Sequence, residues 1–204
     1  MPIPSLILCL VTDLTRAGGI TPLLDSISRA ITGGVNLVQV RAHELDEAAF
    51  ASLASDIAET ARGRAMVTVN GPVAAALVAR ADGIHLPENA PRPDLPAEVS
   101  LLTGRSVHSV ESARRAEAEG ADYIILGTVF PSASHPGGPT GGLSLVSGAA
   151  RAVSIPVIGI GGITAENAAE VISAGASGIA VISAIIGQYD PEAAARGLAR
   201  AIGL

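Results

Sequence analysis

Eight short apolar runs recur along the chain, and most are followed by a segment with helical periodicity. Strand runs that are apolar on both faces are typical of parallel sheets covered by helices. Eight such units predict an α/β protein with the (β/α)8 TIM-barrel fold, and a length of 204 residues lies at the short end of its range. The runs lie at residues 6–12, 36–41, 64–70, 82–86, 100–107, 122–127, 156–160 and 177–182.

An open doubly wound sheet is the alternative architecture. Against it, no Gly-x-Gly-x-x-Gly motif follows the first apolar run. Residues 87–96 are rich in proline, so the fourth helix is expected to be weak, and residues 131–142 form a Gly-, Pro- and Ser-rich stretch without periodicity. No linker interrupts the alternation, which predicts one domain over residues 1–204. Residues suited to helix N-caps are Thr21, Asp46, Ser109 and Thr164.

Composition excludes several classes of function. The net charge is −6 and no basic run exists, which argues against a nucleic-acid partner. No apolar run approaches the ~20 residues that span a membrane, and the first residues lack the basic start of a signal peptide, so a cytoplasmic location is expected. The single cysteine, Cys9, lies in an apolar run without metal-spaced neighbours and is predicted to be a buried small hydrophobe.

Polar side chains gather where the predicted strands end. Residues two apart on a strand face the same way, which pairs Gln39 with Arg41 and Ser106 with His108, and Asn70 ends the third run in the same manner. In a barrel these carboxyl ends form the active site. We therefore expect a functional role for His108. Arg41 as a solvated loop cation and Asn70 as a turn residue are the alternatives.

Two other histidines have different interpretations. His85 lies inside the fourth run between apolar neighbours, which favours a structural histidine over a catalytic one. His135 lies in the Gly-, Pro- and Ser-rich stretch and is compatible with simple solvation.

The ends of the seventh and eighth runs suit an anion. Gly161 and Gly162 let backbone N–H groups approach a phosphate, and a helix expected to start near Thr164 would point its N-terminus there. Ile182 and Ser183 add backbone and hydroxyl groups after the eighth run. Phosphate binding by the loops after strands seven and eight recurs in barrels. Glycines needed only for tight turns are the alternative.

Over nearly its whole length the sequence resembles the family of thiamine phosphate synthases and TenI-type thiazole tautomerases. The matching segments, in chain order, are Leu-Val-Thr-Asp at 10–13, Val-Gln-Val-Arg at 38–41, Val-Asn at 69–70, Ala-Asp-Gly-Ile-His-Leu at 81–86, Ser-Val-His-Ser at 106–109, Gly-Ala-Asp-Tyr-Ile at 120–124, Gly-Thr-Val-Phe-Pro at 127–131, Pro-Val-Ile-Gly-Ile-Gly-Gly-Ile at 156–163 and Ile-Ala-Val-Ile-Ser-Ala-Ile at 179–185. The resemblance implies a barrel and a phosphorylated thiazole ligand.

Departures from the family pattern bear on the activity. A synthase joins a pyrimidine diphosphate to thiazole phosphate, with magnesium bridging the diphosphate. Its pattern implies lysines at position 43 and in the loop 132–135, and aspartates at positions 71 and 90. The sequence instead has His43, Gly71, Ala90 and Ser-Ala-Ser-His. Magnesium prefers carboxylate oxygens, and Glu88 and Asp94 are the nearby substitutes. These losses favour a thiazole tautomerase that needs no metal or other cofactor.

In this interpretation His108 transfers the proton that makes the thiazole aromatic, because imidazole takes up and returns protons near neutral pH. The resemblance places the catalytic histidine at His108, and Arg41 is suited to pair with the substrate carboxylate as a bidentate donor. A degenerate synthase that uses Mg²⁺, or a protein that only binds thiazole or thiamine phosphates, are the alternatives. The partner is a small molecule, and the Ala-rich helices leave a homodimer open. Expected substrate-binding residues are Gln39, Arg41, Asn70, Ser106, Ser132, Ser134 and His135, and expected phosphate-binding residues are Gly161, Gly162, Ile182 and Ser183.

Overall fold

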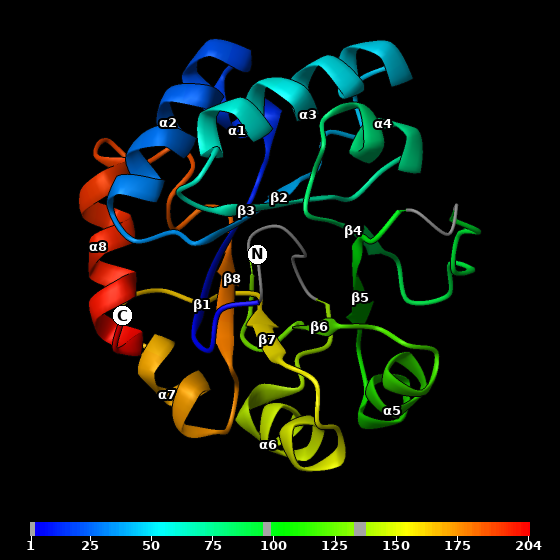
Figure 1. Cartoon of the computed structure of the whole chain (residues 1–204). Coiled ribbons are helices and arrows are strands. Elements are labelled where there is room, and N and C mark those ends of the chain that lie inside the picture. Colours follow the sequence, from blue (N-terminus) through cyan, green and yellow to red (C-terminus); the bar gives the residue numbers. More distant parts are fainter. Residues whose placement is uncertain (1–2, 96–98, 133–137) are drawn as a thin grey trace.

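The computed structural model describes residues 3–95, 99–132 and 138–204. Within these residues the strands are all parallel and close into a barrel in sequence order, with β1 paired to β8 (Figure 1). This confirms the predicted (β/α)8 barrel and rules out the open sheet. The strands are β1 (Ile7–Val11), β2 (Leu37–Val40), β3 (Met66–Val69), β4 (Gly83–Leu86), β5 (Leu102–Val107), β6 (Tyr123–Gly127), β7 (Val157–Ile160) and β8 (Gly178–Val181).

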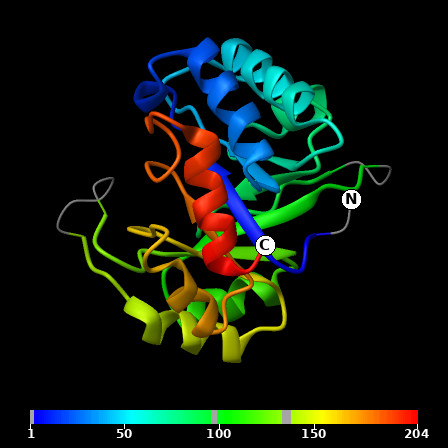
Figure 2. The same cartoon turned by 90° about the vertical axis from the view of Figure 1, so that its left-hand side faces the viewer.

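Helices surround the barrel on the outside, and Figure 2 shows α2, α3 and α8 side by side over one flank of the strands. None of the helices in the described ranges is both long enough and apolar enough to cross a bilayer. The helices are α1 (Leu14–Ala17), α2 (Ile20–Thr32), α3 (Glu47–Ala61), α4 (Val73–Val78), α5 (Val110–Ala118), α6 (Gly142–Ala152), α7 (Ala168–Ser173) and α8 (Pro191–Ile202).

Alternation along each strand divides the core into two layers. On β1, Ile7, Cys9 and Val11 belong to a small cluster with residues of the other strands, whereas Leu8 and Leu10 pack in the larger cluster that includes the helices. Cys9 is fully buried, and this burial raises the pKa of its thiol to about 12. The prediction that Cys9 is a buried small hydrophobe is confirmed.

Two of the four predicted N-caps are confirmed. The side chain of Asp46 accepts the N–H of Ala49, and Ser109 forms a capping box with Ser112. The prediction for Thr21 was wrong because α2 already begins at Ile20, after two glycines with positive φ that turn the chain out of α1.

The prediction for Thr164 was also wrong, since α7 begins only at Ala168. The Asn167 side chain accepts the N–H of Thr164 and donates to the carbonyl of Gly162. This local bonding replaces the first turn of the expected helix.

No helix lies between β4 and β5 in the described residues, as the prolines predict. The connection is instead fixed from the barrel side by Arg105, which is 3% exposed. Its guanidinium Nη1 donates to the carbonyl oxygens of Pro87, Glu88 and Ala90 at 3.3, 3.1 and 2.7 Å. The buried guanidinium of Arg105 therefore holds the β4–β5 connection against the barrel, where other units have a helix.

Candidate active site

A cavity of about 950 Å³ opens at the carboxyl ends of the strands. Most of the residues predicted from strand ends and glycine turns line it together, which confirms that they meet at one end of the barrel. Ser134 and His135 lie outside the described residues. The predicted residues that line the cavity are Gln39, Arg41, Asn70, Ser106, His108, Ser132, Gly161, Gly162, Ile182 and Ser183.

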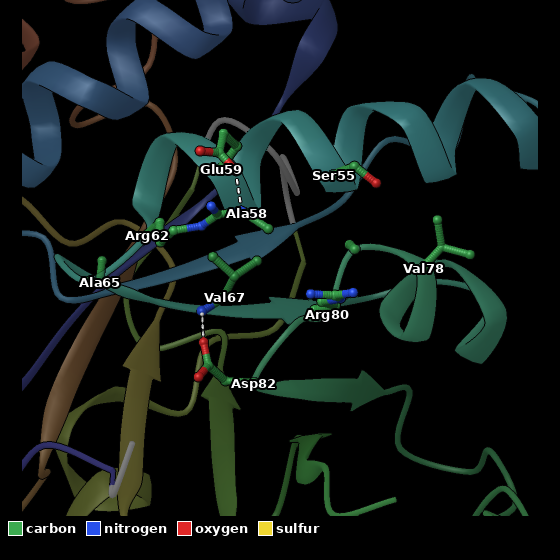
Figure 3. Close-up of a pocket in the computed structure, with 11 residues that line it drawn as sticks. Ser55, Ala58, Glu59, Arg62, Ala65, Val67, Val78, Arg80 and Asp82 are labelled. Carbon is green, nitrogen blue, oxygen red and sulfur yellow. Dashed lines mark hydrogen bonds and ion pairs between the residues drawn. The ribbon is translucent and has the colours of Figure 1, made fainter.

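A second cavity, of about 520 Å³, lies at the opposite end, between the C-termini of α3 and α4 (Figure 3). Three of its charged side chains already have partners within the fold. Glu59 pairs with Arg62, and the carboxylate of Asp82 accepts the N–H of Val67 at 2.9 Å. Because these charges already have partners and the carboxyl ends of the strands lie at the other end of the barrel, the larger cavity is the candidate active site.

Arg41 is fixed through its backbone at the end of β2. The buried hydroxyl of Thr12 accepts the N–H of Arg41 at 2.8 Å and donates to its carbonyl oxygen at 2.8 Å. Gln39, two residues earlier, is 4% exposed, and its Oε1 has no hydrogen-bond partner among the described residues. An unpaired buried amide oxygen is costly, so a ligand donor at this point would be favourable.

His85 lies in the wall of the same cavity, which the sequence interpretation missed. Its Nε2 lies 2.8 Å from the hydroxyl of Ser106, while its Nδ1 is buried without a partner in the described structure. Burial first, and then the charge of Arg105, lowers the pKa of His85 to about 3, so the ring is neutral at physiological pH. The alternation of side chains along β4 could have predicted this position. Ile84 and Leu86 face the helices, so His85 between them faces the inside of the barrel.

His108 stands at the mouth, with its side chain 64% exposed. Its Nδ1 lies 2.8 Å from the carbonyl oxygen of Gly127, which can only accept, so Nδ1 carries the proton. Nε2 is left for a ligand and lies 4.0 Å from the Glu88 carboxylate. Glu88 also pairs with Arg115 at 3.6 Å.

The loops after β7 and β8 present bare peptide groups to the cavity. Gly161 and Gly162 have φ angles of 106° and 62°, and a Cβ on Gly162 would lie 2.3 Å from the carbonyl oxygen of Pro131. In the described residues the N–H groups of Gly162 and Ser183 donate to no other group. Both observations fit an anion held by backbone amides.

The positions at which the family pattern implies magnesium-binding aspartates carry no carboxylate in this chain. Position 71 is glycine, and a Cβ there would lie 2.6 Å from the ring of Phe50, while Ala90 does not line the cavity. Asp94 and Glu88 do not line it either, and Glu88 pairs with Arg115. Within the described part of the chain, no three His, Cys, Asp or Glu residues gather in a way that could hold a metal.

Comparison with known proteins identifies relatives over almost the entire chain. The family model described as thiamine monophosphate synthase matches residues 8–185. The thiamine-phosphate synthase of Roseiflexus castenholzii is 40% identical over 94% of this chain and 86% of its own, and that of Methanoculleus marisnigri is 42% identical over 94% and 92%. A solved thiamine phosphate pyrophosphorylase from Pyrococcus furiosus superposes with a TM-score of 0.83 at 33% identity, covering 97% of this chain and 96% of that one.

These relatives correct the predicted activity. The relatives at about 40% identity are named thiamine-phosphate synthases, so the prediction of a thiazole tautomerase, an isomerase, was wrong. The resemblance to the wider family, and the expected link to thiamine biosynthesis, are confirmed. With a match that spans residues 8–185, the chain belongs to the thiamine monophosphate synthase family.

Proposed function

We propose that this chain is a transferase that makes thiamine phosphate by condensing thiazole phosphate with a pyrimidine diphosphate and releasing pyrophosphate. The observation that carries the proposal is one continuous cavity that joins bare backbone N–H groups on the β7 and β8 side to Arg41 on the β2 side. The activity named for relatives at about 40% identity calls for two anionic substrates in one site.

The thiazole phosphate is assigned to the loops after β7 and β8. The unused N–H groups of Gly162 and Ser183 would donate to the phosphate oxygens, with Gly161 and Ile182 shaping the turn around them. Amide donors in fixed positions hold an anion without a mobile side chain.

The pyrimidine is assigned to the polar wall made by β2, β3, β4 and β5. The unpartnered Oε1 of Gln39 and Nδ1 of His85 are the buried groups that a heteroaromatic ring with an amino substituent would satisfy. Asn70 and the Ser106 hydroxyl line the same wall. The low pKa of His85 keeps it neutral, so its ring acts as a hydrogen-bonding group without carrying charge.

The reaction then requires that the two substrates be aligned and that the negative charge of the leaving diphosphate be stabilised. The lone pair of the thiazole nitrogen forms a bond to the methylene carbon of the pyrimidine. The C–O bond to the diphosphate breaks, and its electron pair leaves with pyrophosphate. No proton has to be removed, so His108 is assigned to substrate binding at the mouth, through its free Nε2, together with Ser132. Charge develops on the leaving diphosphate, which is where cationic groups are needed.

The test is a condensation assay with the purified protein, both substrates, and separate quantification of thiamine phosphate and pyrophosphate. The two products should form in equal amounts. Replacing Ser106 with Ala should raise KM for the pyrimidine, because it removes a hydroxyl from the pyrimidine wall. Ser147→Ala, on the outer helix α6, should leave turnover unchanged. Tight binding of both substrates without any product, with or without Mg²⁺, would show a binding protein instead.

A further inference from the structure

We infer that two guanidinium groups, those of Arg16 and Arg41, neutralise the diphosphate in this protein and that no divalent cation is required for its binding. The inference rests on the proposed function, since it names how that site handles its second anion. The family pattern implies a magnesium ion, but the side chains that line the cavity are not those that would bind one.

The cavity has one carboxylate among its described lining residues, Asp13. That carboxylate is already used. Its Oδ1 caps α1 by accepting the N–H of Arg16 at 2.9 Å, and its Oδ2 lies 3.7 Å from the Nε of the same arginine. Magnesium held by protein takes carboxylates that are free to face it, so Asp13 alone is a poor substitute for the two aspartates that the family pattern implies.

The space for an aspartate at position 71 is also filled. The Phe50 ring, 5% exposed, would lie 2.6 Å from the Cβ of any other residue at this position, so the ring or the loop would have to move. Ala90 packs against the hydrophobic core, and its carbonyl is held by Arg105. As the chain stands, neither position presents a carboxylate to the cavity.

Arginine is the cation that the chain does provide. The sequence contains no lysine, so all 13 of its Lys and Arg residues are arginines. Two of them, Arg16 and Arg41, line the central cavity and also an adjoining hollow of about 770 Å³ between the loops after β1 and β2. His43 lines that hollow as well. Arginine binds phosphate oxygens with two parallel N–H donors, which suits a diphosphate.

The position of Arg16 is set by two neighbours. Asp13 starts the short helix that carries it, and the loop after β8 passes close by, because the Cγ of Arg16 would lie 3.4 Å from a Cβ on Gly187. Its side chain is 38% exposed, which leaves the guanidinium accessible to a ligand. Arg41 is held from the other side by Thr12, and no hydrogen bond or ion pair in the described structure uses its guanidinium.

Two carboxylates lie at this rim beside the arginines, and each has contacts within the fold. Asp13 caps α1, and Glu44 accepts the hydroxyl of Thr15 at 3.3 Å. These carboxylates partly offset the positive charge that Arg16 and Arg41 place at this rim.

Titration calorimetry with inorganic pyrophosphate in the presence of EDTA tests the inference directly. The wild-type protein should bind without metal. Arg16→Gln and Arg41→Gln should each weaken binding about 10- to 100-fold, since a hydrogen bond to a charged group is worth ~1.5–3 kcal/mol. Arg16→Lys should recover part of the loss. The matched control is Arg151→Gln, which removes the same charge from the exposed last turn of α6 and should bind as wild type does.

Two further arms separate the possible results. Thiazole phosphate should bind Arg16→Gln as well as it binds wild type, and the condensation rate should be equal in EDTA and in Mg²⁺. Pyrophosphate binding that appears only with Mg²⁺, undiminished binding by Arg16→Gln, or a loss confined to thiazole phosphate would each overturn the inference. If no thiamine phosphate forms under either condition, the proposed function fails, and the calorimetry still decides whether arginines bind the diphosphate.

Discussion

Gly71 shows at the scale of one residue how packing decides which chemistry is available. The loop after β3 runs against the ring of Phe50, and a Cβ at position 71 would lie 2.6 Å from two ring carbons. Real Cβ atoms do not approach a neighbour so closely, so the ring or the loop must move when a side chain is added. The glycine is therefore required by its neighbour, because its own backbone angle does not lie in the left-handed region.

Gly71→Ala should destabilise the protein by about 1–3 kcal/mol, the usual cost of overpacking a core. The measurement is urea unfolding followed by far-UV circular dichroism. Gly197→Ala is the control, because a Cβ there meets its nearest neighbour at an ordinary 3.9 Å within α8. It should stabilise by about 0.5–1 kcal/mol through helix propensity. Equal effects of the two substitutions would contradict the steric explanation.

His85 makes a second residue-scale prediction. Its pKa of about 3 lies below the ordinary value of 6.5, so between these values the unfolded chain binds a proton that the folded chain does not. Its contribution to stability is thus full above pH 6.5 and declines as the pH falls toward 3. Between pH 7 and pH 5 the loss should be about 2 kcal/mol. Carboxylates also titrate, so the measurement is the difference between wild type and His85→Gln, which should have the flatter profile.

At the scale of the elements, the sequence predicted some helix N-caps correctly and others wrongly. Asp46 and Ser109 were found because each stands directly before a helical pattern and accepts the N–H three residues later. Thr21 and Thr164 have the same chemistry but were wrong, since Gly19 starts α2 earlier and the Asn167 side chain delays α7. Cap preference is a local signal, and competing hydrogen bonds nearby override it.

Ser109 follows His108 directly, so its cap also orients the end of β5. Ser109→Ala should lower stability by about 1 kcal/mol, measured as the midpoint of thermal unfolding. Ser147→Ala, inside α6 and bonded only to the carbonyl of Ser144, should raise it slightly because alanine favours the helix. An unchanged midpoint for Ser109→Ala would show that the capping box contributes nothing to the folded state.

At the scale of the whole molecule, the barrel could be predicted because eight apolar runs have one consistent solution. The closed order β1 to β8 follows from that alternation. Most of the site was also predictable, since the carboxyl ends of parallel strands must converge. Arg16, which lines the cavity and which we propose as a diphosphate ligand, could not be predicted because α1 has only four residues and no periodicity to reveal it. The activity was predicted wrongly because the prediction rested on lysines and aspartates that are missing. Missing residues do not indicate which reaction the protein catalyses.

Closure of the sheet into a ring also predicts cooperative unfolding of one domain. Tyr123 lies inside the barrel at 2% exposure, while Tyr189 is fully exposed, and the chain has no tryptophan. In a Tyr189→Phe variant, the fluorescence of Tyr123 reports on the interior and far-UV circular dichroism on the helices. The two urea transitions should coincide. Separate midpoints would show that the interior and the outer helices form independent units.

The contact between Phe50 and Gly71 has a consequence for the history and redesign of this protein. A carboxylate installed at position 71 while Phe50 is in place has to displace the aromatic ring or the loop, because its Cβ would lie 2.6 Å from two ring carbons. A smaller side chain at position 50 would relieve that contact, but by itself it leaves a void in the core. Either order of the two substitutions therefore passes through a less stable intermediate.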